Sequence, residues 1–268
     1  MEEEKSTMEK EKAILPDITN IKTQDTFTLP SKGLVYDKKD SIPSSITLRR
    51  MTTKEDKMRM RNESEDKIRK AILQACILDE NVDAGKLKLA DANFLLFKLR
   101  VLSLLDDKYK LQLACPSCGS EFIHEINLSD LKINYMTKDK LKDMEIILPL
   151  SQVKVGLQLP SLDNVIKMSD KLKEYFNKFP EADKTEAIYT TSAMLYIKDI
   201  NEQTVMAEEL EDWLDNMDII DNRAFRKKLA KIDDIFGIDT DMKCKCPNCN
   251  SEVSHGLPIT AELFNPSL

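Results

Sequence analysis

Two Cys-Pro-x-Cys motifs that lie far apart in the sequence constrain this fold more than any other feature. The first spans residues 115–118 (CPSC) and the second spans residues 246–249 (CPNC). They continue as Gly-Ser-Glu-Phe-Ile-His and Asn-Ser-Glu-Val-Ser-His, so Cys, Pro, Cys, Ser, Glu and His recur at the same offsets. The motifs therefore form a local internal repeat, separated by the 127 residues 119–245.

This repeat has the spacing of a zinc site. Two residues between a pair of thiolates let both sulfurs reach one ion, and the proline presets the turn. The residue after the second cysteine often needs a positive φ, which Gly119 adopts most easily and Asn250 next. Four thiolates complete a closed tetrahedral site. We therefore predict one structural Zn²⁺ per chain, bound by Cys115, Cys118, Cys246 and Cys249.

The residue types leave three alternatives open. Cys244 could replace Cys246, although four residues would then separate it from Cys249 and the proline would be missing. His124 and His255 recur at equal offsets and could bind this metal or a second one, although a histidine on a hairpin strand is more often a surface group. The cysteines could also pair as disulfides, but a cytosolic protein keeps its thiols reduced.

Composition limits the remaining classes. The N-terminal stretch MEEEKSTMEKEK lacks the apolar segment of a signal peptide, and no apolar run approaches the ~18 residues of a membrane span, so we expect a cytosolic protein. The net charge of −7 disfavours a nucleic-acid partner. With only six glycines and many Lys, Glu and Leu residues, the chain favours helix.

We therefore predict an α+β fold that is mostly helical, with short β-hairpins that form a split zinc-ribbon-like module. Residues 1–25 are polar and predict a mobile N-terminal arm. Residues 26–160 predict an α+β core with the first motif, and residues 161–240 a helical block. Residues 241–268 carry the second motif and a tail expected to pack on the first half through Leu263 and Phe264.

Periodicity places individual elements. Alternation predicts strands at 46–50, 109–113, 122–126, 144–148 and 153–159. Thr52 and Thr53 predict a helix start, and a helix apolar on several sides from Ala90 to Leu105 indicates the centre of the core. Further helices are expected at about 161–178, 183–198, 204–217 and 221–236, with Ser161 and Asp221 as N-terminal caps and Gly237 as the final stop. Cys76, on an apolar helical face, predicts a plain core thiol.

The motifs give no support to catalysis. The sequence holds no H-E-x-x-H, G-x-S-x-G or P-loop pattern, and it has only two histidines. A zinc ion with four thiolate ligands keeps no open position for water or substrate. We therefore expect that the protein is not an enzyme and has no small-molecule substrate.

A series of short segments resembles a known family. In chain order these segments are 29–33 (LPSKG), Tyr36, 46–49 (ITLR), 51–56 (MTTKED), 95–100 (LLFKLR), 107–109 (DKY), the first Cys motif and 127–131 (NLSDL). Together they resemble the baseplate hub assembly proteins of T-even-type contractile-tailed bacteriophages. The resemblance covers about residues 27–160, and the second Cys motif fits it in outline.

The resemblance implies a protein that helps to build the central hub of the phage baseplate, as an assembly chaperone or a structural component. Its partners would be hub or tail proteins, met in the host cytoplasm during assembly or in the virion tail. Residues 29–50 would either pack on the core or dock onto partners, and Leu210, Trp213 and Leu214 would either be core or contact residues. The alternative function is that of a zinc-ribbon nucleic-acid-binding or transcription accessory protein.

Overall fold

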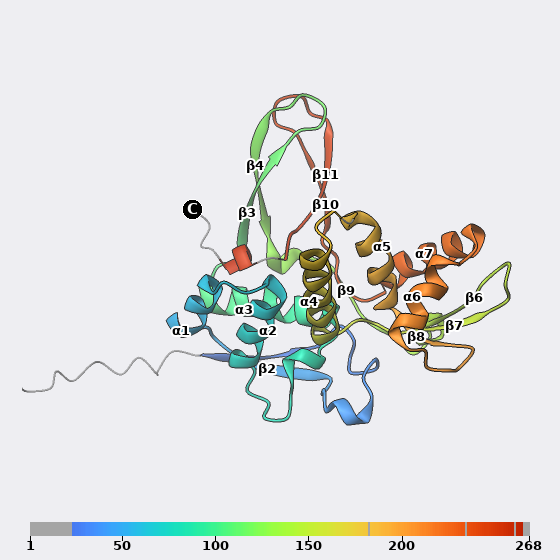
Figure 1. Ribbon diagram of the computed structural model, residues 1–268. Coiled ribbons are helices and arrows are strands. Elements are labelled where there is room, and N and C mark those ends of the chain that lie inside the picture. Colours follow the sequence, from blue (N-terminus) through green and yellow to red (C-terminus); the bar gives the residue numbers. More distant parts are fainter. Residues whose placement is uncertain (1–22, 182, 234, 260, 265–268) are drawn as a thin grey trace, which may run out of the picture.

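The computed structural model describes residues 23–181, 183–233, 235–259 and 261–264, which form a mixed α/β structure of seven α-helices and eleven short strands. Figure 1 shows two hairpins that stand on a body of helices and short sheets. The predicted mobile arm lies mostly outside the described residues. Its end was placed wrongly, because strand β1 (Gln24–Thr28) begins inside it and pairs antiparallel with β2 (Ser45–Arg49).

The first hydrophobic cluster is built around helix α3 (Leu89–Leu104), and its position confirms the central core helix predicted from its apolar faces. Helix α2 (Glu65–Cys76) and the β1–β2 pair contact it. The short helix α1 (Thr53–Asp56) is capped by Thr52, as predicted. Cys76 is fully buried in this cluster, and burial raises the pKa of its thiol to about 12. The thiol therefore stays protonated and packs as an apolar group.

The second hydrophobic cluster joins a three-stranded sheet to the later helices. The predicted strand pair is present as β6 (Glu145–Ile147) and β7 (Lys154–Leu157). Their cluster also contains residues of α6 (Ala207–Asp215) and α7 (Ile219–Asp233). Leu210 and Leu214 are buried in it and Trp213 packs against it, so these three belong to the core.

Two local predictions in this region were wrong. The helix expected at 183–198 ends early, as α5 (Lys184–Met194), because the next residues form the third strand, β8 (Ile197–Ile200), on the edge of β7. Asp221 does not cap the last helix: Asp218 accepts the Ile220 N–H at 2.7 Å, and Asp221 lies within α7. Asp221 is buried and accepts the backbone N–H groups of Leu150 and Ser151, at 2.7 and 3.0 Å.

Helix α4 (Leu162–Lys178) begins at the predicted cap, Ser161, whose side chain accepts the Asn164 N–H. It lies against α2, with ion pairs from Lys67 and Lys70 to Asp170 and Asp163. Its first residue, Leu162, belongs to the first hydrophobic cluster. The boundaries at 160/161 and 240/241 stay predictions.

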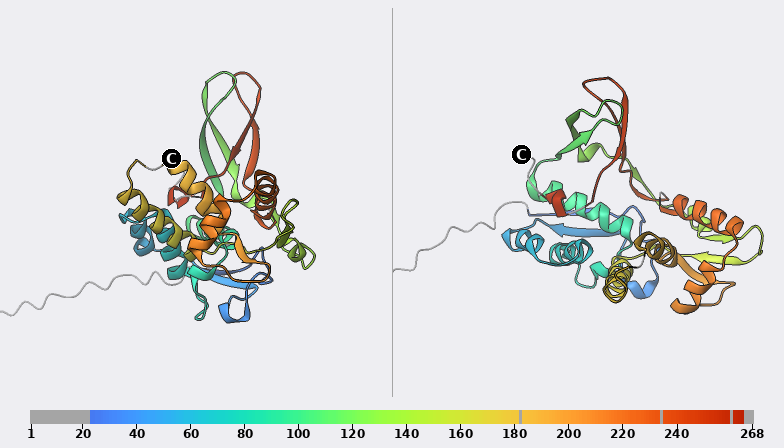
Figure 2. Two further views of the ribbon diagram at one scale, coloured as in Figure 1. Left: turned by 45° about the vertical axis from the view of Figure 1, so that its right-hand side comes forward. Right: turned by 45° about the horizontal axis from the view of Figure 1, so that its top comes forward.

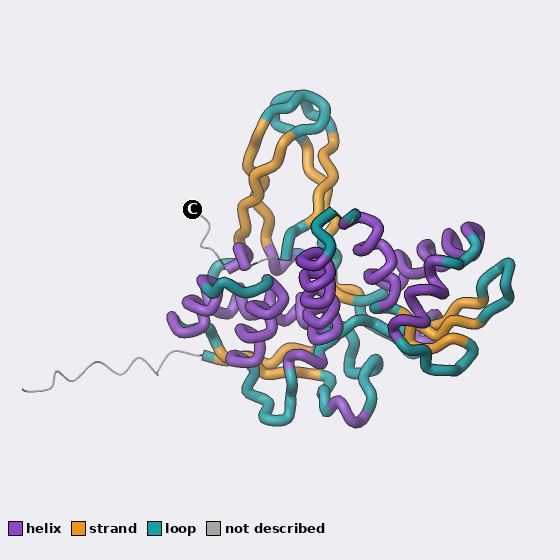
Figure 3. The backbone as a smooth tube through the Cα atoms, viewed as in Figure 1, coloured by secondary structure: helices purple, strands orange, loops and turns teal. Residues whose placement is uncertain are grey.

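Two antiparallel hairpins project together from the helical body (Figures 1 and 2). One pairs β3 (Lys108–Ala114) with β4 (Glu121–Asn127), and the other pairs β10 (Asp241–Lys245) with β11 (Glu252–Gly256). Figure 3 shows their loops meeting at the far end from the helices. Near the base, β5 (Ile133–Asn134) pairs with β9 (Gly237–Ile238) and joins the two halves of the chain.

The end of the described chain returns to the first cluster. Leu263 and Phe264, through which the tail was expected to pack on the first half, are buried there. The buried Arg100 guanidinium donates from Nε to the Leu263 carbonyl at 2.7 Å. None of the helices described here combines the length and the apolar character that crossing a bilayer requires.

Candidate metal centre

The loops of the two hairpins bring Cys115, Cys118, Cys246 and Cys249 into one cluster. Every pair of their sulfurs lies within 4.8 Å. Cys115 Sγ is 3.6 Å from Cys249 Sγ, and Cys118 Sγ is 3.8 Å from Cys246 Sγ. Each of these two contacts joins one motif to the other, so the cluster is shared equally between the hairpins.

The sulfur separations fit a tetrahedral ion. Zinc–thiolate bonds of ~2.3 Å place the sulfurs of a tetrahedral site about 3.8 Å apart. A disulfide needs ~2.05 Å, and all six cysteines are free. The spacing and the donor set therefore suit one zinc-class ion, with two ligands from each hairpin.

The two motifs share one backbone geometry. The Gly119 N–H donates to the Cys115 carbonyl at 2.8 Å, and the Asn250 N–H donates to the Cys246 carbonyl at 2.9 Å. Gly119 has φ +72° and Asn250 has φ +61°, which confirms that the position after the second cysteine is left-handed. The sequence repeat is thus a structural repeat, and the two halves of the cluster are related by an approximate two-fold arrangement.

Two serines complete this arrangement, and the sequence interpretation gave them no role. Ser120 Oγ lies 3.0 Å from Cys118 Sγ and 3.5 Å from Cys246 Sγ. Ser251 Oγ lies 2.9 Å from Cys249 Sγ and 3.3 Å from Cys115 Sγ. Each hydroxyl therefore touches one sulfur of its own motif and one of the other. Their recurrence at the same offset was the signal that could have identified them.

Hydrogen bonds prepare the thiols to ionise. The Ser251 hydroxyl lowers the pKa of Cys115, and the backbone N–H groups of Cys118 and Ser117 act in the same direction. The Ser120 hydroxyl and N–H, with the Asn248 amide, lower the pKa of Cys118 to about 6.

Cys249 behaves differently. Ser251 acts to lower its pKa, but burial and the hydrogen bonds with Cys118 and Cys115 act against Ser251, and the pKa of Cys249 is raised. Adjacent thiolates repel, so the cluster needs a cation before all four sulfurs can be charged.

Cys244, His124 and His255 are not part of the four-cysteine cluster. Their ligand atoms lie within 4.8 Å of one another and form a separate group on the facing strands. Cys244 packs beside Cys115 and Cys246, but its sulfur does not lie within 4.8 Å of all four sulfurs of the cluster. The structure therefore places Cys244 and the two histidines, which the sequence allowed as alternative ligands, in a group of their own.

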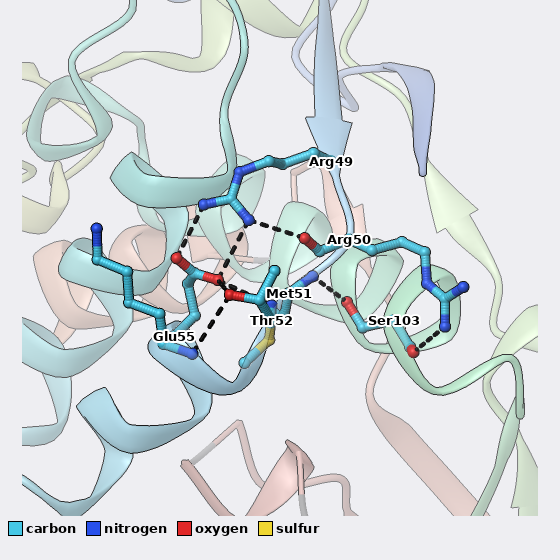
Figure 4. A network of polar contacts seen from close by, with 7 residues as sticks. Arg49, Arg50, Met51, Thr52, Glu55 and Ser103 are labelled. Carbon is cyan, nitrogen blue, oxygen red and sulfur yellow. Dashed lines mark hydrogen bonds and ion pairs between the residues drawn. The ribbon is translucent and has the colours of Figure 1, made fainter. Parts of the chain in front are cut away.

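The N-terminal segments that carry the family resemblance are bound tightly into the fold. Figure 4 shows the Arg49 guanidinium against the buried Glu55 carboxylate, which also accepts the Thr52 N–H. Asp91 accepts the Ser31 N–H at 3.0 Å and the Tyr36 hydroxyl at 2.7 Å. These contacts support the interpretation that residues 29–50 pack on the core.

A comparison with protein families gives the chain its identity. The family model described as "T4 bacteriophage base plate protein" matches residues 23–265. No curated protein and no solved structure matches the chain. The match spans both hairpins, both hydrophobic clusters and nearly the whole sequence, and the chain therefore belongs to the family of T4 bacteriophage base plate proteins.

Proposed function

We propose that the protein helps to build the central hub of the phage baseplate and acts through contacts with hub or tail proteins. Within this role, Cys115, Cys118, Cys246 and Cys249 hold one structural zinc ion in a split zinc-ribbon-like module. The observation that carries the zinc is the clustering of four sulfurs from two distant motifs within 4.8 Å. The family match supports the baseplate setting.

The zinc serves the architecture and not a reaction. Four protein thiolates fill a tetrahedral coordination shell, so neither water nor substrate has a position on the ion. The ion offsets the repulsion between the thiolates and ties the two hairpin loops together. The proposed protein is therefore a scaffold without catalytic activity, and its function lies in the surfaces that it presents.

The helical region offers a surface for such contacts. Six large apolar side chains are exposed by 44–60%: Tyr175 of α4, Phe179 directly after it, Ile188 and Tyr189 of α5, and Ile219 and Ile220 of α7. Tyr175 and Phe179 lie together, with ring centroids 5.1 Å apart, and the Tyr189 hydroxyl of α5 donates to Asn222 of α7. Exposed apolar groups that lie close together mark protein–protein contact sites. We place the hub-facing surface here.

Capture from infected cells tests the function. Tagged protein, expressed by the phage, should retain baseplate and tail proteins, identified by mass spectrometry. Phe179→Asp should reduce their recovery while circular dichroism stays unchanged, and Met60→Asp, at an 80% exposed position of the first half, should not. Recovery of RNA polymerase in place of tail proteins would overturn the proposal and favour the transcription alternative.

Two further measurements separate the parts of the proposal. Mass spectrometry of purified virions distinguishes a hub component, which remains, from an assembly chaperone, which does not. Metal analysis compares the wild-type chain with Cys115→Ser and Cys249→Ser, each of which should lose one equivalent of zinc, whereas Cys76→Ala should lose none. Full zinc retention in both serine variants would refute the ligand assignment and leave the baseplate role standing.

A further inference from the structure

The facing strands of the two hairpins hold a second group of metal-ligand side chains. His124 comes from β4, Cys244 from β10 and His255 from β11. Their ligand atoms lie within 4.8 Å of one another although three strands supply them. Cys244 pairs with Val253 across β10 and β11, so His255, two residues further along, is its diagonal neighbour. Strand register therefore positions Cys244 and His255 relative to each other.

This group lies one layer below the four-cysteine cluster. Phe122, Cys244 and Val253 pack directly against Cys115 and Cys246. His124 follows Phe122 by two residues, and His255 follows Val253 by two residues. Two residues of strand advance about 6.7 Å and return the side chain to the same face. The imidazoles thus lie on the inner faces of the hairpins, nearer their base than the sulfurs.

The ring nitrogens of one member of this group, His255, lack partners among the described residues. Both ring nitrogens of His255 are buried and have no hydrogen-bond partner among the described residues. The two rings meet edge to face, with centroids 5.3 Å apart and planes at 74°. Buried polar atoms without partners in a folded protein need an explanation, and a bound ion is one.

We propose that His124, Cys244 and His255 bind a second zinc-class transition-metal ion between the two hairpins. Two imidazole nitrogens and one thiolate form a donor set that zinc accepts and that magnesium and calcium do not. The ion would satisfy a ring nitrogen of His255 that otherwise has no partner. It would join β4 to β10 and β11 partway along the hairpins, where the four-cysteine ion holds only their loops.

Three protein ligands leave one position on this ion for water or for a donor from another protein. A surface depression lined by Met242, Ser254, His255 and Gly256, among others, lies beside the group. The four-cysteine ion has no such position. The second ion should therefore bind and dissociate more readily than the ion in the four-cysteine cluster.

A cobalt titration of the metal-free, full-length protein tests this inference. Thiolate-to-cobalt absorption reports cobalt–sulfur bonds, and elemental analysis gives the number of ions per chain. The wild-type protein should bind two equivalents. Cys244→Val should keep the first and lose the second, because valine fills the position opposite Val253 without a sulfur. Ser254→Val, on the exposed side of the same hairpin, is the matched control and should bind two.

The outcomes are distinct. Wild-type protein that binds one equivalent, or folded Cys244→Val that still binds two, overturns the second site. If Cys244→Val does not fold by circular dichroism, His124→Leu carries the same test with the same expectation. Cys115→Ser should lose the first equivalent and keep the second, so a failure of the four-cysteine assignment can be told apart from a failure of the second site.

Discussion

At the scale of single residues, the groups around the four cysteines favour the thiolate forms that bind a metal. The sulfurs are close enough to repel one another when ionised, and the serine hydroxyls and backbone N–H groups of the loops reduce that repulsion. Ser120 and Ser251 are the residues whose contribution can be measured without removing a ligand.

Ser120→Ala and Ser251→Ala should weaken zinc binding while leaving four thiolates in place. Each removes a hydroxyl that contacts two sulfurs, and the loss of such a supporting hydrogen bond costs about tenfold or more in metal affinity. Competition with a chromophoric chelator measures the affinity. Ser117→Ala, in the exposed part of the first loop, is the control. Equal affinity in all three variants would show that the hydroxyls have no influence on the ion.

The pKa of Glu55 gives a second prediction at this scale, about the pH dependence of stability. The Arg49 guanidinium holds the pKa of this carboxyl at about 2, against an ordinary value of 4.5, although burial opposes the shift. Because the folded state has the lower pKa, the ionised carboxylate contributes stability above pH ~4.5, and that contribution is lost as the pH falls towards 2.

Glu55→Gln should therefore lower the free energy of unfolding at pH 7 by about 2 kcal/mol, the usual value for a hydrogen bond to a charged group. Its stability should also fall less steeply than that of the wild type between pH 4.5 and 2. Urea unfolding across that range measures both. Glu63→Gln is the control, since its ion pair with Arg61 is exposed and 3.8 Å long. A variant that follows the wild-type pH profile would contradict the role given to the Arg49–Glu55 pair.

At the scale of elements, the hairpin loops depend on a backbone conformation that few residues adopt. Gly119 has φ +72° and open space around the position of a Cβ, so an added side chain meets no atom and only the backbone is strained. Gly119→Ala should cost about 1 kcal/mol of stability and weaken metal binding. Gly256→Ala, also in open space but without a positive φ, should cost much less. Denaturant midpoints compare the two, and equal losses would contradict this account.

Much of the element pattern could be predicted from the sequence. Local chemistry decided the cap at Thr52, the central apolar helix, the flanking hairpins and the left-handed residues of the loops. β8 was missed because it forms by pairing with β7, which lies about 40 residues earlier in the chain. The local sequence pattern does not show that this edge of β7 is free to pair. Asp221 was misplaced for the same reason: its carboxylate accepts hydrogen bonds from Leu150 and Ser151, far back in the chain.

The candidate site was predicted more completely than the fold around it. The meeting of the four cysteines, the two loops that carry them and the long separation of these loops in the chain all follow from spacing and thiolate chemistry. The sequence did not reveal that Cys244 and the two histidines meet on the inner faces of the hairpins, because their approach depends on how one hairpin faces the other. Nor did it reveal Asp91, a buried carboxylate on α3 that fixes the segment carrying Ser31 and Tyr36.

At the scale of the whole molecule, the four-cysteine cluster joins parts of the chain that the sequence keeps far apart. Closing a loop of this length covalently would contribute about 5 kcal/mol by reducing the entropy of the unfolded chain. The pairing of β5 with β9 already brings the same regions together near the hairpin base. The proposed zinc cross-link at the hairpin loops would therefore contribute less than the full value, and its effect should be greatest on the hairpins themselves.

Removal of zinc with a strong chelator should lower the midpoint of urea unfolding and expose the hairpin loops to protease before the helical body. Without the ion the thiolates repel, and the short β5–β9 pair is left to hold together the regions that carry the two hairpins, near the hairpin bases. Added zinc should restore the midpoint of the wild type but not of Cys115→Ser. Cleavage that begins in the helical region, or a midpoint that does not change on chelation, would show that the hairpins are held together by their packing and not by the ion.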